Sequence, residues 1–397
     1  MARLRFCGFD YEASAGGAIS GSGTYSYGVN LDSDFLFVSP SSDTTFYVPG
    51  AFSSTTVSAG RNAASGALGL LSSSPGANIT SYGTFGCAVP RAAIGNPIEI
   101  WATFDISQAL ARNVNDPATL ERAEARCQIF KFGDLSLRLR SITNYTGTAD
   151  LTFEAFNGAT SLGTITIVSY TSLSWMFVRV YAKLHASTGH FDVAIDGQSA
   201  SYASLNSVAT TPLVSVTHLY FSGGVLGVTA GSNLLQIGAI DNLLLDSTNF
   251  PVGRPSGRRV TIASDGTLSG WASTVGGTLT SALSSFDSGF ARGTNNGSTA
   301  LLNLTAPSTV GLNGVLGWQL HSYGISNIDT ISVKKLRTGV DVSGAVTNGT
   351  YVASLTPPAT PSTLTPTYID TLFYSSGSTD FTLAGVPNTK LRLEVIS

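Results

Sequence analysis

The most informative stretch of this chain runs from Trp175 to Gly197, WMFVRVYAKLHASTGHFDVAIDG. Along its first half, apolar side chains alternate with polar or aromatic ones, which is the period of a strand with one face in a core. The apolar positions are Met176, Val178, Val180, Ala182 and Leu184. A Ser-Thr-Gly turn at 187–189 leads into a second alternating run with the same pattern. Two such runs joined by a glycine-bearing turn predict a β-hairpin, and Asp196-Gly197 predicts the next turn.

The same alternation extends outward from the hairpin in both directions. Ile98–Ile106 carries apolar side chains at every even position, and Leu135–Arg140 and Leu151–Ala155 alternate in the same way. Residues 237–246 are apolar on both faces, which is typical of a central strand between two layers. One helix is predicted over Asp116–Arg126, because an acidic N-cap, a proline at the first helical position and a basic last turn follow one another there.

The composition favours an all-β protein with a polar, weakly charged surface. The 397 residues include 43 glycines and only 11% charged residues, and the formal net charge is −3. A nucleic-acid partner is excluded, because phosphate binding needs clustered Lys and Arg. No membrane insertion is expected, since no apolar run approaches the roughly 20 residues of a spanning helix. Hydrophobic residues make up 43% of the chain, which is enough for a core and argues against disorder.

The N-terminus and the cysteines predict synthesis in a reducing cytoplasm. The first ten residues contain no apolar segment typical of a secretory signal. Cys7, Cys87 and Cys127 are odd in number and widely spaced, so they fit neither a disulfide framework nor a zinc site. We therefore expect buried free thiols.

Changes in composition and strand pattern along the chain predict three parts. Residues 1–247 hold the strands described above, 248–298 form a Gly/Ser/Thr-rich connector, and 299–397 form a second β block. The strands expected in that block are Ala300–Leu304, Gly314–Gly324, Asp329–Leu336, Gly349–Leu355, Ile369–Ser375, Asp380–Ala384 and Leu391–Ile396. The final strand could pair within the chain or be donated to a neighbouring copy.

The order of motifs between residues 175 and 262 resembles a concanavalin A-like (laminin G-like) jelly roll, in the form found in tailed-bacteriophage virion proteins. The Trp-led hairpin ending in Val-Ala-Ile-Asp-Gly is followed by Ile240–Asp246 and by Pro251–Arg254. Ser264–Thr267 with Trp271, and the opening Arg3–Asp10, are also similar to segments of such proteins. The resemblance covers residues 1–295 and implies a jelly-roll sandwich followed by a second, smaller C-terminal β-sandwich.

The resemblance also implies a function. It predicts a structural protein of a phage virion, associated with the tail or fibre or decorating the capsid, whose partners are copies of itself and other virion proteins. The chain would be made in the host cytoplasm and located in the virion as a homo-oligomer. The alternative is a carbohydrate-binding module of a tail that contacts a host surface glycan.

The sequence predicts neither an enzyme nor a cofactor. None of the nucleophile-elbow, phosphate-loop, dinucleotide or zinc-protease motifs occurs. Glycoside hydrolysis needs two carboxylates about 5–10 Å apart. Glu99 and Asp105 lie about 20 Å apart along one strand at 3.3 Å per residue, and the sequence cannot place Glu154 against either. His185 and His190 flank one turn with Asp192 nearby, and we expect them to be surface side chains rather than metal ligands.

Two sets of residues are candidates for binding. Trp175, Phe177 and Tyr181 share the face of their strand that points away from the core. The N-terminal segment or the second domain could cover them, or they could contact another subunit or a glycan. Asp196, Asp241 and Asp246 are oxygen donors near strand ends and are candidate calcium ligands. They could equally serve a turn and a strand end, so no metal site is predicted.

Overall fold

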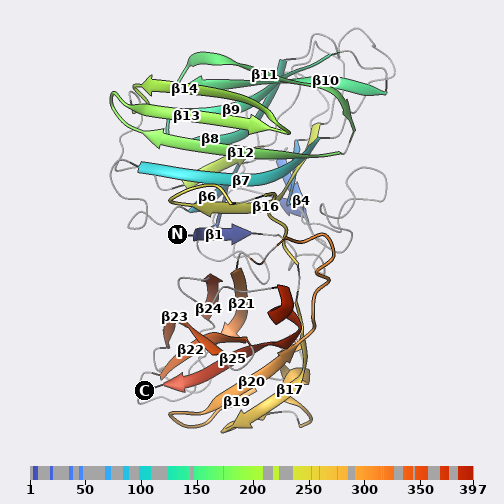
Figure 1. Ribbon diagram of the computed structural model, residues 1–397, viewed down its shortest axis with the longest axis vertical. Coiled ribbons are helices and arrows are strands. Elements are labelled where there is room, and N and C mark those ends of the chain that lie inside the picture. Colours follow the sequence, from blue (N-terminus) through green and yellow to red (C-terminus); the bar gives the residue numbers. More distant parts are fainter. Residues whose placement is uncertain are drawn as a thin grey trace. The chain divides into compact units, whose positions relative to one another are not determined.

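The structure is a computed structural model (Figure 1). It describes residues 3–7, 18–20, 35–38, 44–47, 68–72, 84–88, 98–108, 124–143, 147–172, 174–208, 218–222, 236–251, 253–258, 260–274, 276–284, 291–313, 315, 317–325, 334–342, 345–355, 367–374 and 383–396. The chain divides into two compact units, Met1–Gly257 and Arg258–Ser397. Both are built from antiparallel strands, so the all-β class predicted from the alternation is confirmed. The three-part division at 247 and 298 stays a prediction.

The first unit contains a nine-stranded and a seven-stranded sheet. The nine-stranded sheet runs in the order β14 (Gln198–Leu205), β13 (Gly189–Ile195), β12 (Trp175–Leu184), β7 (Ile98–Gln108), β16 (Gln236–Asp246), β5 (Leu68–Ser72), β4 (Thr44–Tyr47) and β2 (Ala18–Ser20), with β1 (Arg3–Cys7) also paired with β16. The seven-stranded sheet runs in the order β11 (Thr160–Thr171), β10 (Thr148–Asn157), β9 (Leu135–Thr143), β8 (Glu124–Phe132), β15 (His218–Ser222), β6 (Thr84–Ala88) and β3 (Phe35–Val38). Both sheets combine runs of consecutive strands, β12 to β14 and β8 to β11, with neighbours that are distant in sequence, such as β7 and β16, as expected for a sandwich with crossover connections.

The predicted hairpin is β12 and β13. Val180 lies opposite Val193, so the apolar residues of both strands share one face. The turn that follows β13 has only two residues, since Ile195 pairs with Gln198. Asp196 and Gly197 both have positive φ, 44° and 88°, which is the type I′ geometry that matches the twist of a hairpin. The turn predicted at Asp196-Gly197 is confirmed in place.

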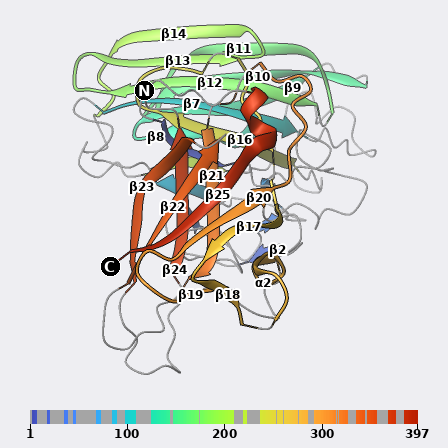
Figure 2. The same ribbon diagram turned by 60° about the horizontal axis from the view of Figure 1, so that its bottom comes forward.

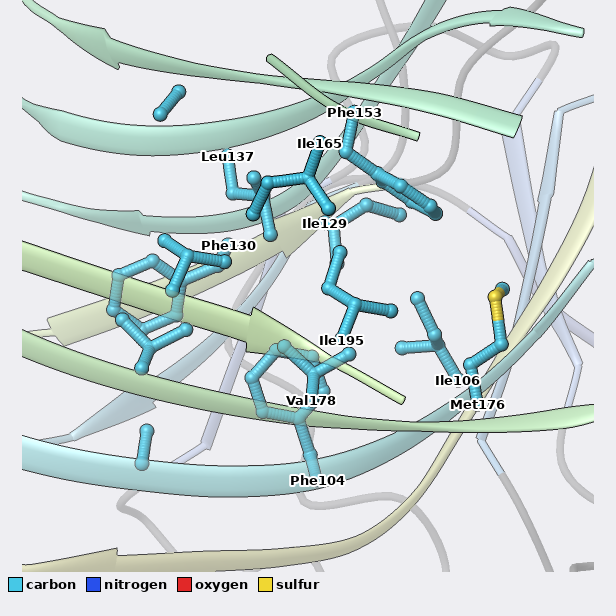
Figure 3. Close-up of a cluster of buried hydrophobic side chains, with 14 of the residues drawn as sticks. Phe104, Ile106, Ile129, Phe130, Leu137, Phe153, Ile165, Met176, Val178 and Ile195 are labelled. Atoms are coloured by element: carbon cyan, nitrogen blue, oxygen red, sulfur yellow. The ribbon is translucent and has the colours of Figure 1, made fainter. Parts of the chain in front are cut away.

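The core lies between the two sheets, where both sets of inward side chains meet (Figure 3). Phe130 of β8 stacks on Phe104 of β7 at 6.4 Å between ring centroids and on Phe191 of β13 at 6.2 Å. All three rings are essentially inaccessible to solvent. A ring from one sheet therefore packs against two rings from the other, which holds the layers together by apolar burial.

The predicted helix over Asp116–Arg126 is wrong at its C-terminal end. Glu124, Ala125 and Arg126 belong to strand β8, and Glu124 pairs with Ser141 of β9. The local capping signal is outweighed there by the ladder that β8 forms with β9, since tertiary pairing overrides intrinsic propensity. The first part of the predicted helix lies outside the described residues, as do the side chains of all three cysteines.

The second unit is organised around a five-stranded sheet in the order β17 (Ile262–Ser269), β20 (Thr299–Leu304), β25 (Thr389–Ile396), β22 (Lys334–Val342) and β23 (Ala345–Leu355) (Figure 2). Two further strand pairs are β18 (Trp271–Ser273) with β19 (Ala291–Gly293), and β21 (Gly317–Ile325) with β24 (Thr367–Tyr374). The final strand pairs with β20 and β22 of its own chain. The strand expected at Asp380–Ala384 is wrong at its C-terminal end, because Leu383–Asn388 is a 3-10 helix, η3, and the first three residues of the expected strand lie outside the described residues.

One short helix, α2 (Leu279–Ser284), packs on this sheet through Leu279, and Ala282 of the same helix is also buried. Among the helices that the structure describes, none is long and apolar enough to cross a membrane. The N-terminus of α2 is held by Asp265 of β17. Its carboxylate accepts hydrogen bonds from the backbone N–H groups of Leu279 and Thr280 and from the Thr280 hydroxyl, at 2.7–2.8 Å.

Replacing Asp265 with alanine is expected to lower the free energy of unfolding of the second unit by about 1–2 kcal/mol, the usual cost of losing a helix cap. Burial alone would raise the pKa of Asp265, but its hydrogen bonds to Thr280 and Leu279 lower it overall. The stabilisation is therefore complete above the ordinary carboxyl pKa of 3.8 and is lost as pH falls through the lowered value. Denaturant titrations of both proteins at neutral and acidic pH measure this. If the difference in unfolding free energy between the two proteins stayed the same below the lowered pKa, the role assigned to the ionised Asp265 would be contradicted.

Candidate functional site

The outer face of the nine-stranded sheet carries most of the described aromatic and charged side chains of the first unit that point away from the core. The strand registers place them in rows. One row runs from Glu99 of β7 through Lys183 of β12 to His190 of β13. The next runs from Trp101 through Tyr181 to Asp192, and β14 adds Ser201 beside Asp192. These seven residues are called the outer-face cluster below.

Two stacked rings form the centre of the outer-face cluster. Trp101 and Tyr181 lie directly opposite each other on neighbouring strands, with ring centroids 4.7 Å apart and planes at 28°. That spacing equals the distance between adjacent strands, so the rings stand upright side by side. The His190 ring lies 5.4 Å from that of Tyr181 at 55°. The three rings form a ridge across β7, β12 and β13.

Polar groups surround this ridge. Lys183 Nζ lies 3.6 Å from Glu99 Oε1, and the Tyr181 hydroxyl is hydrogen-bonded to Glu99. His190 Nε2 lies 2.7 Å from Asp192 Oδ1 and 3.1 Å from Ser201 Oγ. Burial of the phenol, the charge and hydrogen bond of Glu99, and the charge of Asp192 together raise the pKa of Tyr181 to about 12. The Tyr181 hydroxyl is therefore a proton donor, not a base, at neutral pH.

Residues 247–251 and 253–257, called the strap, follow β16 and contact β7 and β12 on another part of the same face. Arg254 donates from Nε to Asp105 Oδ1 at 2.6 Å and from Nη2 to the Trp175 carbonyl oxygen at 3.1 Å. The Arg254 guanidinium also lies 5.5 Å from the Phe177 ring centroid, and Arg179 lies 4.9 Å from that of Phe250 in the strap.

A buried polar group anchors the strap. Asp105 is almost fully buried, and Asn242 Nδ2 donates to its Oδ2 at 3.0 Å. The backbone N–H of Gly257 donates to Asn242 Oδ1 at 2.6 Å. Asn242 has a φ of 50° and lies in the bulge between Asp241 and Leu244 of β16. The bulge thereby aims an amide at both Asp105 and the strap, which explains why a polar residue interrupts the apolar strand.

The structure separates the three aromatic residues that the sequence proposed as an interface. Phe177 packs against Arg254 of the strap, and the backbone carbonyl of Trp175 accepts a hydrogen bond from the same arginine, whereas Tyr181 belongs to the outer-face cluster. Arg254, which contacts Phe177, lies in the stretch that the sequence assigned to the connector. Sequence alternation could show that Tyr181 points outward. Only the pairing of β12 with β7 and β13 shows that Trp101, Glu99 and His190 are its neighbours.

The three candidate calcium ligands have separate local roles. Asp196 Oδ1 accepts a hydrogen bond from the Phe177 backbone N–H, and Asp241 Oδ1 accepts one from that of Asn242. Asp246 Oδ1 accepts hydrogen bonds from the backbone N–H and hydroxyl of Thr248. Within the described part of the chain, no three His, Cys, Asp or Glu side chains are grouped so that they could hold a metal ion.

The histidines and carboxylates weighed for catalysis are also dispersed. His185 Nδ1 accepts hydrogen bonds from the backbone N–H groups of Ser187 and Thr188, so it closes its turn, whereas His190 pairs with Asp192. Glu154 lies on β10 of the seven-stranded sheet, where Arg140 and Ser161 donate to it. It therefore faces neither Glu99 nor Asp105.

Comparisons with known proteins show likeness in structure but not in sequence. No protein-family model matches the chain, and no curated protein matches it. An alginate lyase from Chlorella virus is 10% identical, with a TM-score of 0.30, over 47% of this chain and 87% of its own. A GH131 beta-glucanase catalytic domain from Podospora anserina is 10% identical (TM-score 0.33; 52% and 80%). A Lotus tetragonolobus seed lectin is 8% identical (TM-score 0.32; 55% and 94%). These figures concern the fold alone.

The prediction that the chain is not an enzyme is contradicted by this set of structures. Several alginate lyases and a glucanase occur in it beside the lectins. The absence of catalytic sequence motifs excluded specific families of enzyme, and a sheet-face site assembled from several strands leaves no such motif. The lack of those motifs therefore does not exclude catalysis, which an activity assay would detect. The lectin-like β-sandwich is confirmed, whereas a phage origin is not shown by these structures.

Proposed function

We propose that the first unit binds carbohydrate at the outer-face cluster. The main support for this proposal is the stacked Trp101–Tyr181 pair. Hydrogen-bonding groups flank the pair on both sides. The charged side chains around it, Lys183, Glu99, His190 and Asp192, are 23–39% exposed, so a ligand can reach them.

The chemistry of a sugar matches this arrangement. A sugar has apolar C–H patches that pack on aromatic rings, and hydroxyl groups that both donate and accept hydrogen bonds. The outer-face cluster offers acceptors in Glu99 and Asp192 and a donor in Lys183, with Ser201 able to act as either. Because these side chains are already ordered by contacts with one another, binding would immobilise few additional rotamers.

Removal of the Trp101 ring tests whether the ridge binds glycan. Replacing Trp101 with alanine is expected to weaken glycan binding at least about tenfold, equivalent to about 1.4 kcal/mol. A glycan array would identify the probe, and isothermal titration calorimetry would give its affinity for each variant. The matched control is Phe156→Ala, which removes an aromatic ring beside Arg138 on β10 of the other sheet and is expected to leave affinity unchanged. Failure of the unaltered protein to bind any glycan would contradict the proposal, as would equal losses of affinity in the Trp101→Ala and Phe156→Ala variants.

We propose in addition that the chain acts in a phage virion, assembling with copies of itself and with other virion proteins. The support is the sequence resemblance of residues 1–295. Immunogold labelling of purified particles distinguishes the two positions. Label on the tail would favour host contact through a glycan, and label on the head would favour capsid decoration. Unlabelled particles would contradict the virion role.

A further inference from the structure

Resting on the proposed function, we infer that the outer-face cluster selects uncharged sugars and discriminates against acidic polysaccharides. The reason is the distribution of charge within the cluster. Two carboxylates, those of Glu99 and Asp192, lie on either side of the Trp101–Tyr181 ridge, and both act on the Tyr181 phenol. An acidic sugar placed on the ridge would bring a third negative charge between them.

The described cations in and beside the outer-face cluster are already engaged. Lys183 pairs with Glu99 at 3.6 Å, and Arg179 lies over the Phe250 ring of the strap at 4.9 Å. His190 is hydrogen-bonded to Asp192 and Ser201. Within the outer-face cluster, the carboxylates of Glu99 and Asp192 outnumber the one permanent cation, Lys183. The cluster therefore has no surplus positive charge with which to neutralise a polymer that carries about one negative charge per sugar.

The hydrogen-bonding groups favour the same choice. Ionised carboxylates accept hydrogen bonds only, so Glu99 and Asp192 need donors from the ligand. Sugar hydroxyls supply donors. The carboxylate of an acidic sugar supplies acceptors only and repels both groups, by about 1 kcal/mol for each pair of charges 4 Å apart in water and more where water is excluded.

The dimensions of the face set the probe. The cluster spans four strands, from β7 to β14, and three strand spacings amount to about 14 Å. This is the extent of a short oligosaccharide lying across the strands. Neutral β-glucan and galactan tetrasaccharides and an alginate tetrasaccharide are therefore suitable ligands for a direct comparison of affinity.

The experiment measures the affinity of the full chain for each tetrasaccharide by isothermal titration calorimetry at low and at high salt. At least one neutral ligand is expected to bind about tenfold or more tighter than alginate, with an affinity nearly independent of salt. Glu99→Gln removes one negative charge and releases Lys183. It is expected to shift the ratio of affinities toward alginate about fivefold or more. Glu394→Gln makes the same change of charge in the second unit and is the control, with no shift expected.

The outcomes separate the two proposals. Tighter binding of alginate than of either neutral ligand, with an affinity that falls steeply as salt is added, would overturn the selectivity and leave carbohydrate binding intact. An unchanged ratio in a folded Glu99→Gln protein would overturn the role of Glu99. Absence of binding to any of the three saccharides and to the glycan array would overturn carbohydrate binding itself. Near-ultraviolet circular dichroism establishes that each variant is folded.

Discussion

Replacement of Phe130 with alanine is expected to lower the free energy of unfolding of the first unit by about 3–5 kcal/mol. The ring is completely buried and stacks on Phe104 and Phe191 of the opposite sheet. Its removal costs both the transfer of the ring from water and the cavity that remains, because strands fixed in two ladders cannot collapse around the space. Since this approaches the total stability of a typical domain, the first unit is expected to unfold at a much lower temperature.

Differential scanning calorimetry of the full chain measures this, with the second unit as an internal reference. Phe130→Leu retains most of the volume and is expected to cost less than about 1.5 kcal/mol. Val168→Ala is the control for removal of an apolar side chain, because Val168 is 67% exposed and surface changes are usually within about 0.5 kcal/mol. Equal effects of Phe130→Ala and Val168→Ala would show that Phe130 does not link the two sheets.

Replacement of Arg254 with methionine is expected to cost about 2–4 kcal/mol, because it leaves Asp105 buried without its charged partner. The Asp105 side chain is 1% exposed and that of Arg254 is 31% exposed, so the loss is smaller than for a fully buried pair. Methionine keeps an apolar stem beside Phe177, so the measurement isolates the charge. We also expect the strap to become more sensitive to proteolysis, since Arg254 contacts β7 and β12 together.

The double variant Asp105→Asn/Arg254→Met is the control for that interpretation. Replacing the charged carboxylate of Asp105 with a neutral amide is expected to recover at least half of the stability lost in Arg254→Met, as measured by denaturant titration. Limited proteolysis of the same proteins reports on the strap. A double variant no more stable than Arg254→Met would mean that Arg254 acts through packing on Phe177 rather than through the charge of Asp105.

Much of the fold could be predicted from the sequence, because strand periodicity is a local property. The alternation in Trp175–Gly197 assigned the two faces of β12 and β13 correctly, and the Asp-Gly pair predicted the turn that both positive φ angles require. The errors fell where local signals were outweighed by partners distant in sequence. Residues 124–126 carry part of a helix signal but pair with β9. Ala384 was assigned to a strand and lies in the short helix η3.

The candidate site was only partly predictable. Tyr181 was identified, because its outward direction follows from the alternation within one strand. Glu99, Trp101 and Lys183 were not assigned to a site, although they lie on strands whose faces were correctly predicted. Glu99 had been compared with Asp105 on its own strand, whereas its contacts are with Lys183 and Tyr181 on the next strand.

The all-β class, the inward and outward faces of the main strands and the turn at Asp196-Gly197 therefore follow from the residues alone. The division of the outward row, with Phe177 beside Arg254 of the strap and Tyr181 beside Trp101 and His190, depends on how the strands pair. The direction of a side chain is set by the backbone of its own strand. Its neighbours depend instead on strand order and register, which are set by burial of the whole core.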